Sequence, residues 1–165
     1  MSDDAVNLTI GPICLQICPD AIATFTKHRQ RCFFSRESGG QLFARVRGNN
    51  WEIVAATGPK TRDSRSRFGF RPHRPSEQEE IFEYHRLGYD YVGDWHTHPQ
   101  DVPHPSPDDL ESIRNLVRES IHHLPGFLLM IVGRDRFPKG LWCSFHSLDG
   151  SFVSGTVEPA AAKRR

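Results

Sequence analysis

Residues 93–109 read GDWHTHPQDVPHPSPDD and hold the densest group of metal-ligating side chains in the chain. His96 and His98 lie two residues apart at the end of an expected strand, so the strand period of two places both imidazoles on one face. Asp109 falls in the first turn of an expected helix, and the proline-rich residues 99–105 can return its carboxylate to that face. Two imidazoles and one carboxylate form a ligand set typical of catalytic zinc, with a fourth position left for water. The pattern predicts a zinc site.

Spacing alone leaves a plainer interpretation open. A His-x-His pair arises by chance in a chain with nine histidines, and Ser106 followed by Asp109 is an ordinary helix start without any metal. A hydrolytic site also needs a base. Glu37 is the best candidate, because it stands beside Gly39-Gly40 in a segment that otherwise lacks acids; a solvated surface carboxylate is the alternative.

Apolar periodicity and turn residues predict the elements around this stretch. Strands are expected over residues 10–18, 31–47, 51–57, 89–96, 127–133, 141–147 and 151–157, with a bend at the glycine pair of the second. Helices are expected over residues 19–30, 77–87 and 106–124, and Ser76 with Glu79 forms a capping box for the middle one. Trp95 faces away from the two histidines and is expected in the core.

The chain of 165 residues has no repeat and no internal linker, so one domain is expected. It spans residues 10–157, with flexible ends at residues 1–9 and 158–165. Its class is mixed α/β (α+β), with a sheet of about six strands flanked by two or three helices.

Composition narrows the class of protein. Hydrophobic residues make up 37% and charged residues 25%, as in soluble globular proteins, and the formal charge of +1 provides no global attraction to nucleic acid or membrane. Residues 1–9 carry Asp3 and Asp4 and lead into no export signal, so the protein is expected in the cytoplasm. Its four cysteines are then reduced thiols, and the Cys14/Cys18 pair lacks the partner pair of a zinc knuckle.

Residues 58–75 form a basic segment with six cations and one acid. It is either a solvated connector or a surface that grips an extended or acidic partner. Three of its arginines are candidates for substrate binding: Arg65, Arg67 and Arg71. Nucleic-acid binding through these cations is a weaker alternative, because the chain as a whole is neutral.

The spacing of the histidines, Ser106 and Asp109, with Glu37 in Glu-Ser-Gly-Gly-Gln-Leu upstream, resembles the JAMM motif of the JAB1/MPN/Mov34 metalloproteases. The resemblance runs from the first helix through the strand at Leu141. It implies the JAB/MPN fold, a curved mixed sheet flanked by helices with the site at one sheet edge. It further implies one catalytic Zn²⁺, with the following roles: His96, His98 and Asp109 as ligands, Glu37 as general acid/base, and Ser106 as the hydroxyl that stabilises the tetrahedral intermediate. Many members have a glycine where this chain has Ala44.

Within that family, the short single-domain form and the Pro-x-Pro-Ser-Pro segment at residues 103–107 resemble bacterial members. Among these the chain is most similar to the JAB-type deconjugating peptidases of CBASS antiphage operons. The resemblance implies a zinc isopeptidase that cleaves after the extended C-terminal tail of a cGAS-like nucleotidyltransferase conjugated to its targets. A deconjugase for a ubiquitin-like or sulfur-carrier protein is the alternative substrate class, and a non-catalytic MPN scaffold is the alternative of another class.

Overall fold

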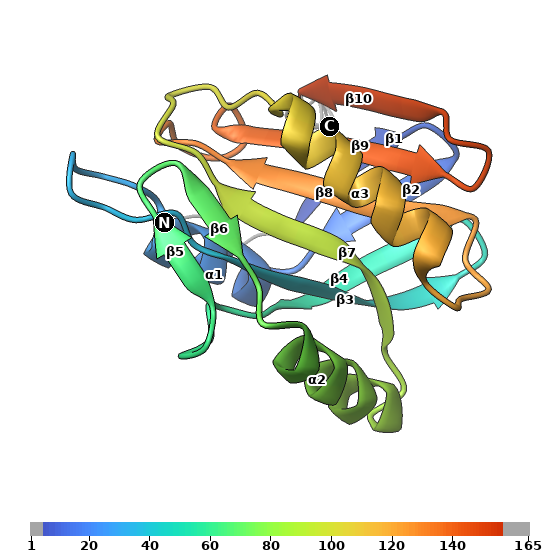
Figure 1. Ribbon diagram of the computed structural model, residues 1–165. Coiled ribbons are helices and arrows are strands. Elements are labelled where there is room, and N and C mark those ends of the chain that lie inside the picture. Colours follow the sequence, from blue (N-terminus) through green and yellow to red (C-terminus); the bar gives the residue numbers. More distant parts are fainter. Residues whose placement is uncertain (1–4, 157–165) are drawn as a thin grey trace, which may run out of the picture.

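The structure is a computed structural model that describes residues 5–156 (Figure 1). Its elements are β1 (Val6–Ile10), β2 (Ile13–Ile17), α1 (Pro19–His28), β3 (Gly39–Arg47), β4 (Asn50–Ala56), β5 (Ser64–Ser66), β6 (Gly69–Arg71), α2 (Arg74–Arg86), β7 (Asp90–Thr97), α3 (Pro107–Glu119), β8 (Gly126–Val132), β9 (Leu141–Ser147) and β10 (Phe152–Thr156). Eight strands form one sheet in the order β1-β2-β4-β3-β7-β8-β9-β10, and β5 and β6 form a separate hairpin. Two neighbouring pairs, β2/β4 and β7/β8, are parallel. The mixed α/β class is therefore confirmed.

Figure 1 shows α3 in front of the sheet, α1 behind it, and α2 apart from both, next to β7. The two faces are distinguished at β7. The Trp95 ring, 1% exposed, packs against Phe25 of α1 with 5.1 Å between ring centroids. Its neighbour His96 points the other way, toward α3. The expectation that Trp95 belongs to the core is confirmed. The opposite face of β7 carries the two histidines.

The sheet contains more strands than the six expected. Residues 10–18 were expected to form one strand, but Gly11 takes a positive φ of 55° and turns the chain, so that residues 6–10 pair with residues 13–17. Residues 6–9 are therefore part of the sheet, which corrects the expectation of a flexible end at residues 1–9. The tail at 158–165 lies outside the described residues.

Further boundaries also differ from those expected. The strand expected over residues 31–47 begins only at Gly39, and the helix expected over residues 106–124 ends at Glu119. The helix expected to start at Glu77 begins at Arg74 instead, because Pro75 suits a first helical turn. Ser76 forms no cap, and its hydroxyl lies 2.8 Å from the His73 ring. The basic segment is likewise no plain connector, since residues 64–66 and 69–71 pair as a hairpin. Across residues 5–156, no helix is both long and apolar enough to cross a membrane.

The expectation that residues 127–133 form a strand buried on both faces is confirmed by β8. All seven residues of β8 are buried, as its unbroken apolar sequence predicted. Ala44, where many family members have glycine, is fully buried and borders a bulge at which the register of β3 on β4 shifts. The alanine therefore lies within the strand and leaves the candidate site residues in place.

The glycine pair at the start of β3 allows close packing. A Cβ on Gly40 would lie 1.9 Å from the Thr57 carbonyl oxygen, and one on Gly39 would lie 2.7 Å from that of Trp95. Gly40→Ala is expected to lower the free energy of unfolding by about 1–3 kcal/mol, because the strands must separate to admit the methyl group. Urea denaturation measures this. Gly69→Ala is the matched control, since its Cβ meets only the Ser66 hydroxyl at 3.3 Å; equal midpoints for both variants would contradict the expectation.

Candidate active site

Three metal-ligating side chains meet where β7 ends and α3 begins. The Nε2 atoms of His96 and His98 are 3.1 Å apart, and each lies 3.2 Å from a carboxylate oxygen of Asp109. Within residues 5–156, this is the one group of three or more His, Cys, Asp or Glu side chains whose ligand atoms all lie within 4.8 Å of one another. The strand period and the helix start thus bring together the residues that the sequence singled out.

The start of α3 holds the Asp109 carboxylate in place. The Asp109 N–H donates to the Ser106 hydroxyl (3.1 Å), and the Ser106 N–H donates to Asp109 Oδ2 (2.7 Å). This reciprocal capping box satisfies two helix-end donors and fixes the carboxylate rotamer. The helix start of the plainer interpretation is therefore present, and the same cap points Asp109 at the histidines.

The separations within this group fit a bound metal ion. Ligands about 2.0–2.2 Å from a tetrahedral ion lie about 3.3–3.6 Å from one another, slightly more than the separations of 3.1 and 3.2 Å found here. Burial alone would raise the pKa of Asp109, but hydrogen bonds from His96 and His98 lower it below its ordinary value. Asp109 also raises the pKa of His98 against the effect of burial. The carboxylate is held ionised, as a ligand must be.

Glu37 lies in the irregular segment just before β3 and is only 5% exposed. Burial, the largest influence, raises its pKa to about 7; His98 lowers it and Asp109 raises it by smaller amounts. Its carboxyl lines the same cavity of about 980 Å³ as His96, His98, Asp109 and Ser106. All five residues of the sequence motif therefore face one space, and Glu37 is not the solvated surface acid that the sequence left as an alternative.

The three candidate substrate-binding arginines have different surroundings. Arg71 lines the cavity. Arg65 instead donates to the backbone carbonyl of Glu37 at 2.7 Å, and the Arg67 guanidinium stacks 3.5 Å from the Phe33 ring centroid. Only one of the three faces the space in which a substrate would lie.

Sequence reasoning missed two further carboxyl groups that line this cavity. Glu77 and Asp94 both line it, and burial raises the pKa of each carboxyl, to about 7 for Glu77. Arg74 pairs with Glu77 at 2.8 Å, and the Tyr91 hydroxyl donates to Asp94 at 2.6 Å. No signal in the sequence pointed to Glu77, because α2 has only a weak amphipathic pattern and Glu77 is one of several acidic residues in it.

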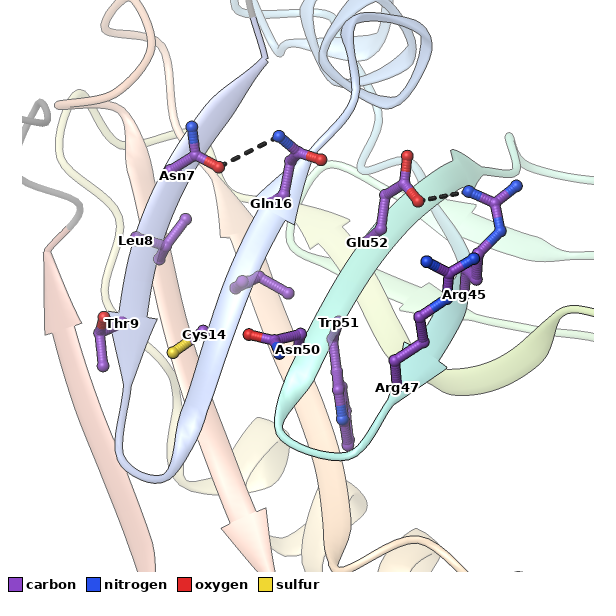
Figure 2. A pocket seen from close by; sticks show the side chains of 11 residues that line it. Asn7, Leu8, Thr9, Cys14, Gln16, Arg45, Arg47, Asn50, Trp51 and Glu52 are labelled. Carbon is purple, nitrogen blue, oxygen red and sulfur yellow. Dashed lines mark hydrogen bonds and ion pairs between the residues drawn. The ribbon is translucent and has the colours of Figure 1, made fainter.

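A second cavity, of about 480 Å³, lies on the surface of β1, β2, β3 and β4 (Figure 2). Figure 2 shows it lined by polar side chains, including the Arg45–Glu52 pair and the amides of Asn7 and Gln16. It contains no imidazole and one thiol, that of Cys14. It therefore lacks the residues of a hydrolytic centre.

Comparison with known proteins identifies the family. Residues 19–144 match the family described as prokaryotic homologs of the JAB domain. This chain belongs to that family. The resemblance inferred from the motif is thus confirmed, and the JAB domain spans most of the chain, from α1 into β9.

Three proteins similar to this JAB-domain chain carry the name CD-NTase/cGAS isopeptidase. The one from Vibrio cholerae is 33% identical over 85% of this chain and 90% of its own length. The one from Escherichia coli is 31% identical over 76% of this chain and 78% of its own. The one from Pseudomonas aeruginosa is 32% identical over 73% and 78%.

Solved structures support the fold. A protein from Desulfitobacterium hafniense matches this JAB domain with a TM-score of 0.61 at 16% identity, over 86% of this chain and 90% of that one. A protein from Salinibacter ruber matches with a TM-score of 0.55 at 20% identity, over 90% and 94%. At these identities the likeness concerns the fold alone.

Proposed function

We propose that this JAB-domain protein is a cytoplasmic zinc isopeptidase that releases a cGAS-like nucleotidyltransferase (CD-NTase) from the targets to which its C-terminus is conjugated, within a CBASS antiphage system. The observation that carries the proposal is the His96–His98–Asp109 group facing Glu37 across one cavity. The names of the three similar proteins support the substrate class. Because two imidazoles and a carboxylate leave one tetrahedral position open, the ligand set favours a catalytic zinc over a structural one.

The reaction divides between the ion and the chain's own residues. His96, His98 and Asp109 would hold a zinc ion, which would supply Lewis acidity for the scissile carbonyl and a pKa of about 7 for the attacking water. Glu37 takes the proton from that water and returns it to the departing amine. In the metal-free protein, burial raises the pKa of this carboxyl to about 7.

Ser106 is the proposed hydrogen-bond donor to the negative charge that develops on the carbonyl oxygen. Its oxygen already accepts the Asp109 N–H, so its hydroxyl hydrogen is free to donate to the developing oxyanion. Contacts of this class contribute about 3 kcal/mol to transition-state stability. The helix start therefore provides one metal ligand and one oxyanion donor.

The substrate tail has to reach this centre in an extended form. Residues of the β5–β6 hairpin and of α3 both line the cavity. A tail that passes between these two elements would therefore reach the metal ligands. Arg71, at the end of β6, stands at the cavity as the candidate contact for that tail. Free backbone groups on a short hairpin can pair with an extended peptide, which would hold its carbonyl in register.

The test uses a purified conjugate of a CD-NTase whose C-terminus is joined to a lysine of a target protein. We expect release of the CD-NTase with an intact C-terminus, detected by mass spectrometry. Release should stop after chelation and return when Zn²⁺ is added. Conjugates of a ubiquitin-like protein are the comparison: cleavage of these alone would contradict the substrate class but not the chemistry. No cleavage of either by the zinc-loaded protein would indicate a non-catalytic scaffold.

A further inference from the structure

The segment that carries Glu37 has no regular structure of its own. Residues 29–38 form neither helix nor strand, yet a general base must be held precisely. The β5–β6 hairpin supplies the missing support. The Glu37 N–H donates to the Ser66 carbonyl at 2.7 Å, and the Arg65 Nε donates to the Glu37 carbonyl at 2.7 Å. Both backbone groups of Glu37 are thus bound by neighbouring residues of β5.

Arg65 also reaches the next residue, and through it the metal-ligand strand. Its Nη2 donates to the Ser38 hydroxyl. The Ser38 N–H donates to Thr97 Oγ1 at 2.9 Å, and the Thr97 N–H donates to the Ser38 carbonyl at 2.8 Å. Thr97 stands between His96 and His98. One arginine therefore connects the segment of the base to the strand of the ligands.

The buried members of this network leave little freedom. Ser38 is 2% exposed and Thr97 is fully buried. Gln30, 1% exposed, adds a parallel link, because its amide donates to the carbonyls of Ser35 (3.2 Å) and Arg67 (3.0 Å). Three consecutive residues of the hairpin, Arg65–Arg67, are thus hydrogen-bonded to residues 29–38.

The surroundings of Arg65 suit a positioning role. Within residues 5–156 it forms no ion pair with a carboxylate, and both of its hydrogen bonds go to the Glu37 segment. Only a planar guanidinium presents Nε and Nη donors side by side to two neighbouring acceptors; a lysine would reach one. The residue does not line the cavity, so a tail in that cavity would not touch it.

We propose that Arg65 is a positioning residue, which fixes the Glu37 backbone relative to the strand of His96 and His98 and thereby sets the placement of the general base. The inference rests on the proposed function for its effect on turnover. It replaces the expectation from the sequence that Arg65 binds substrate. The two roles predict opposite kinetics: a positioning residue acts on kcat, whereas a substrate contact acts on KM.

The kinetic test compares Arg65→Ala, Arg65→Lys and Arg62→Ala on the CD-NTase conjugate. Because misplacement by about 1 Å costs about 100-fold, we expect Arg65→Ala to lower kcat by about 10- to 100-fold with KM nearly unchanged. Zinc content should equal that of the wild type, and Arg65→Lys should recover part of the loss. Arg62 is exposed on the same segment, so its variant controls for the lost charge. A raised KM with unchanged kcat would overturn the proposal.

A second measurement needs no substrate. Hydrogen exchange reports the opening of individual amides, and the Glu37 and Ser38 amides should exchange at least about 10-fold faster in Arg65→Lys than in the wild type, while those of β8 stay protected. Unchanged protection at Glu37 and Ser38 would overturn the positioning role, whether or not the conjugate is cleaved. A wild-type protein that cleaves no conjugate while the exchange result holds would instead refute the proposed function.

Discussion

Glu37→Gln is expected to lower turnover of the conjugate by about 100- to 10,000-fold, the range that a positioned general base contributes. The amide keeps the size of the side chain and fits the same buried space, but it cannot accept a proton. Zinc content should stay at about one ion per chain, because Glu37 lies outside the group of three ligand atoms within 4.8 Å. Single-turnover kinetics measure the turnover rate, and elemental analysis of the same preparation measures the zinc content.

A matched replacement separates this role from a general loss of negative charge. Glu79 is an exposed carboxylate on α2, so Glu79→Gln removes the same charge far from the chemistry, and turnover should be normal. Normal turnover in Glu37→Gln as well would exclude Glu37 as the base, and the proton acceptor would have to be sought among the other groups that line the cavity.

The same variant has a consequence for stability in the metal-free protein. Burial raises the pKa of Glu37 to about 7 from an ordinary 4.5, so the folded state binds its proton more tightly than the unfolded chain does. The wild type therefore loses stability as pH rises from 4.5 through about 7, whereas Gln has no proton to lose. Urea unfolding at pH 4 and pH 8 measures this. The free energy of unfolding of Glu37→Gln, relative to that of the wild type, should be higher at pH 8 than at pH 4. An equal difference at both values would contradict the raised pKa.

The sequence predicted the site better than it predicted the sheet. His96, His98 and Asp109 follow local rules, the period of a strand and the cap of a helix, so their meeting could be inferred from spacing. The hairpin at residues 64–71 could not, because its strands have three residues each and carry no apolar alternation. By contrast, β1 does carry a strand signal, because Val6–Ile10 alternate between apolar and polar residues, but the expected strand was started only at residue 10.

What supports the site is less visible in the sequence than the site itself. The bonds between Ser38 and Thr97 join residues 59 positions apart, and two of the groups involved are backbone amides that every residue carries. The sequence indicated Arg65 only as one of three arginines of the basic segment that could bind substrate, and not as a partner of Glu37. Its partners, a carbonyl and a hydroxyl, give no pairing signal of opposite charge. Such contacts depend on tertiary structure, so composition and periodicity do not predict them.

Asp109→Ala is expected to lose the metal, and with it all turnover. Removing one of three protein ligands should weaken zinc binding by more than about 100-fold, since even outer partners of a ligand contribute about 10- to 100-fold. The variant also removes the acceptor of the Ser106 N–H, so the start of α3 loses part of its cap. Elemental analysis after dialysis and the unfolding midpoint measure the two effects.

Asp109→Asn separates the ligand role from the cap. Its amide oxygen can still accept the Ser106 N–H, so α3 should keep most of its stability. The neutral amide loses the charge that hydrogen bonds from His96 and His98 stabilise, and it is a poor zinc ligand, so the metal should still be lost. Asp108→Ala removes a carboxylate from the same helical turn and should keep its zinc. If Asp109→Asn retained one zinc per chain, the ion would be held elsewhere, and the geometry at the end of β7 would be that of a helix cap facing two histidines.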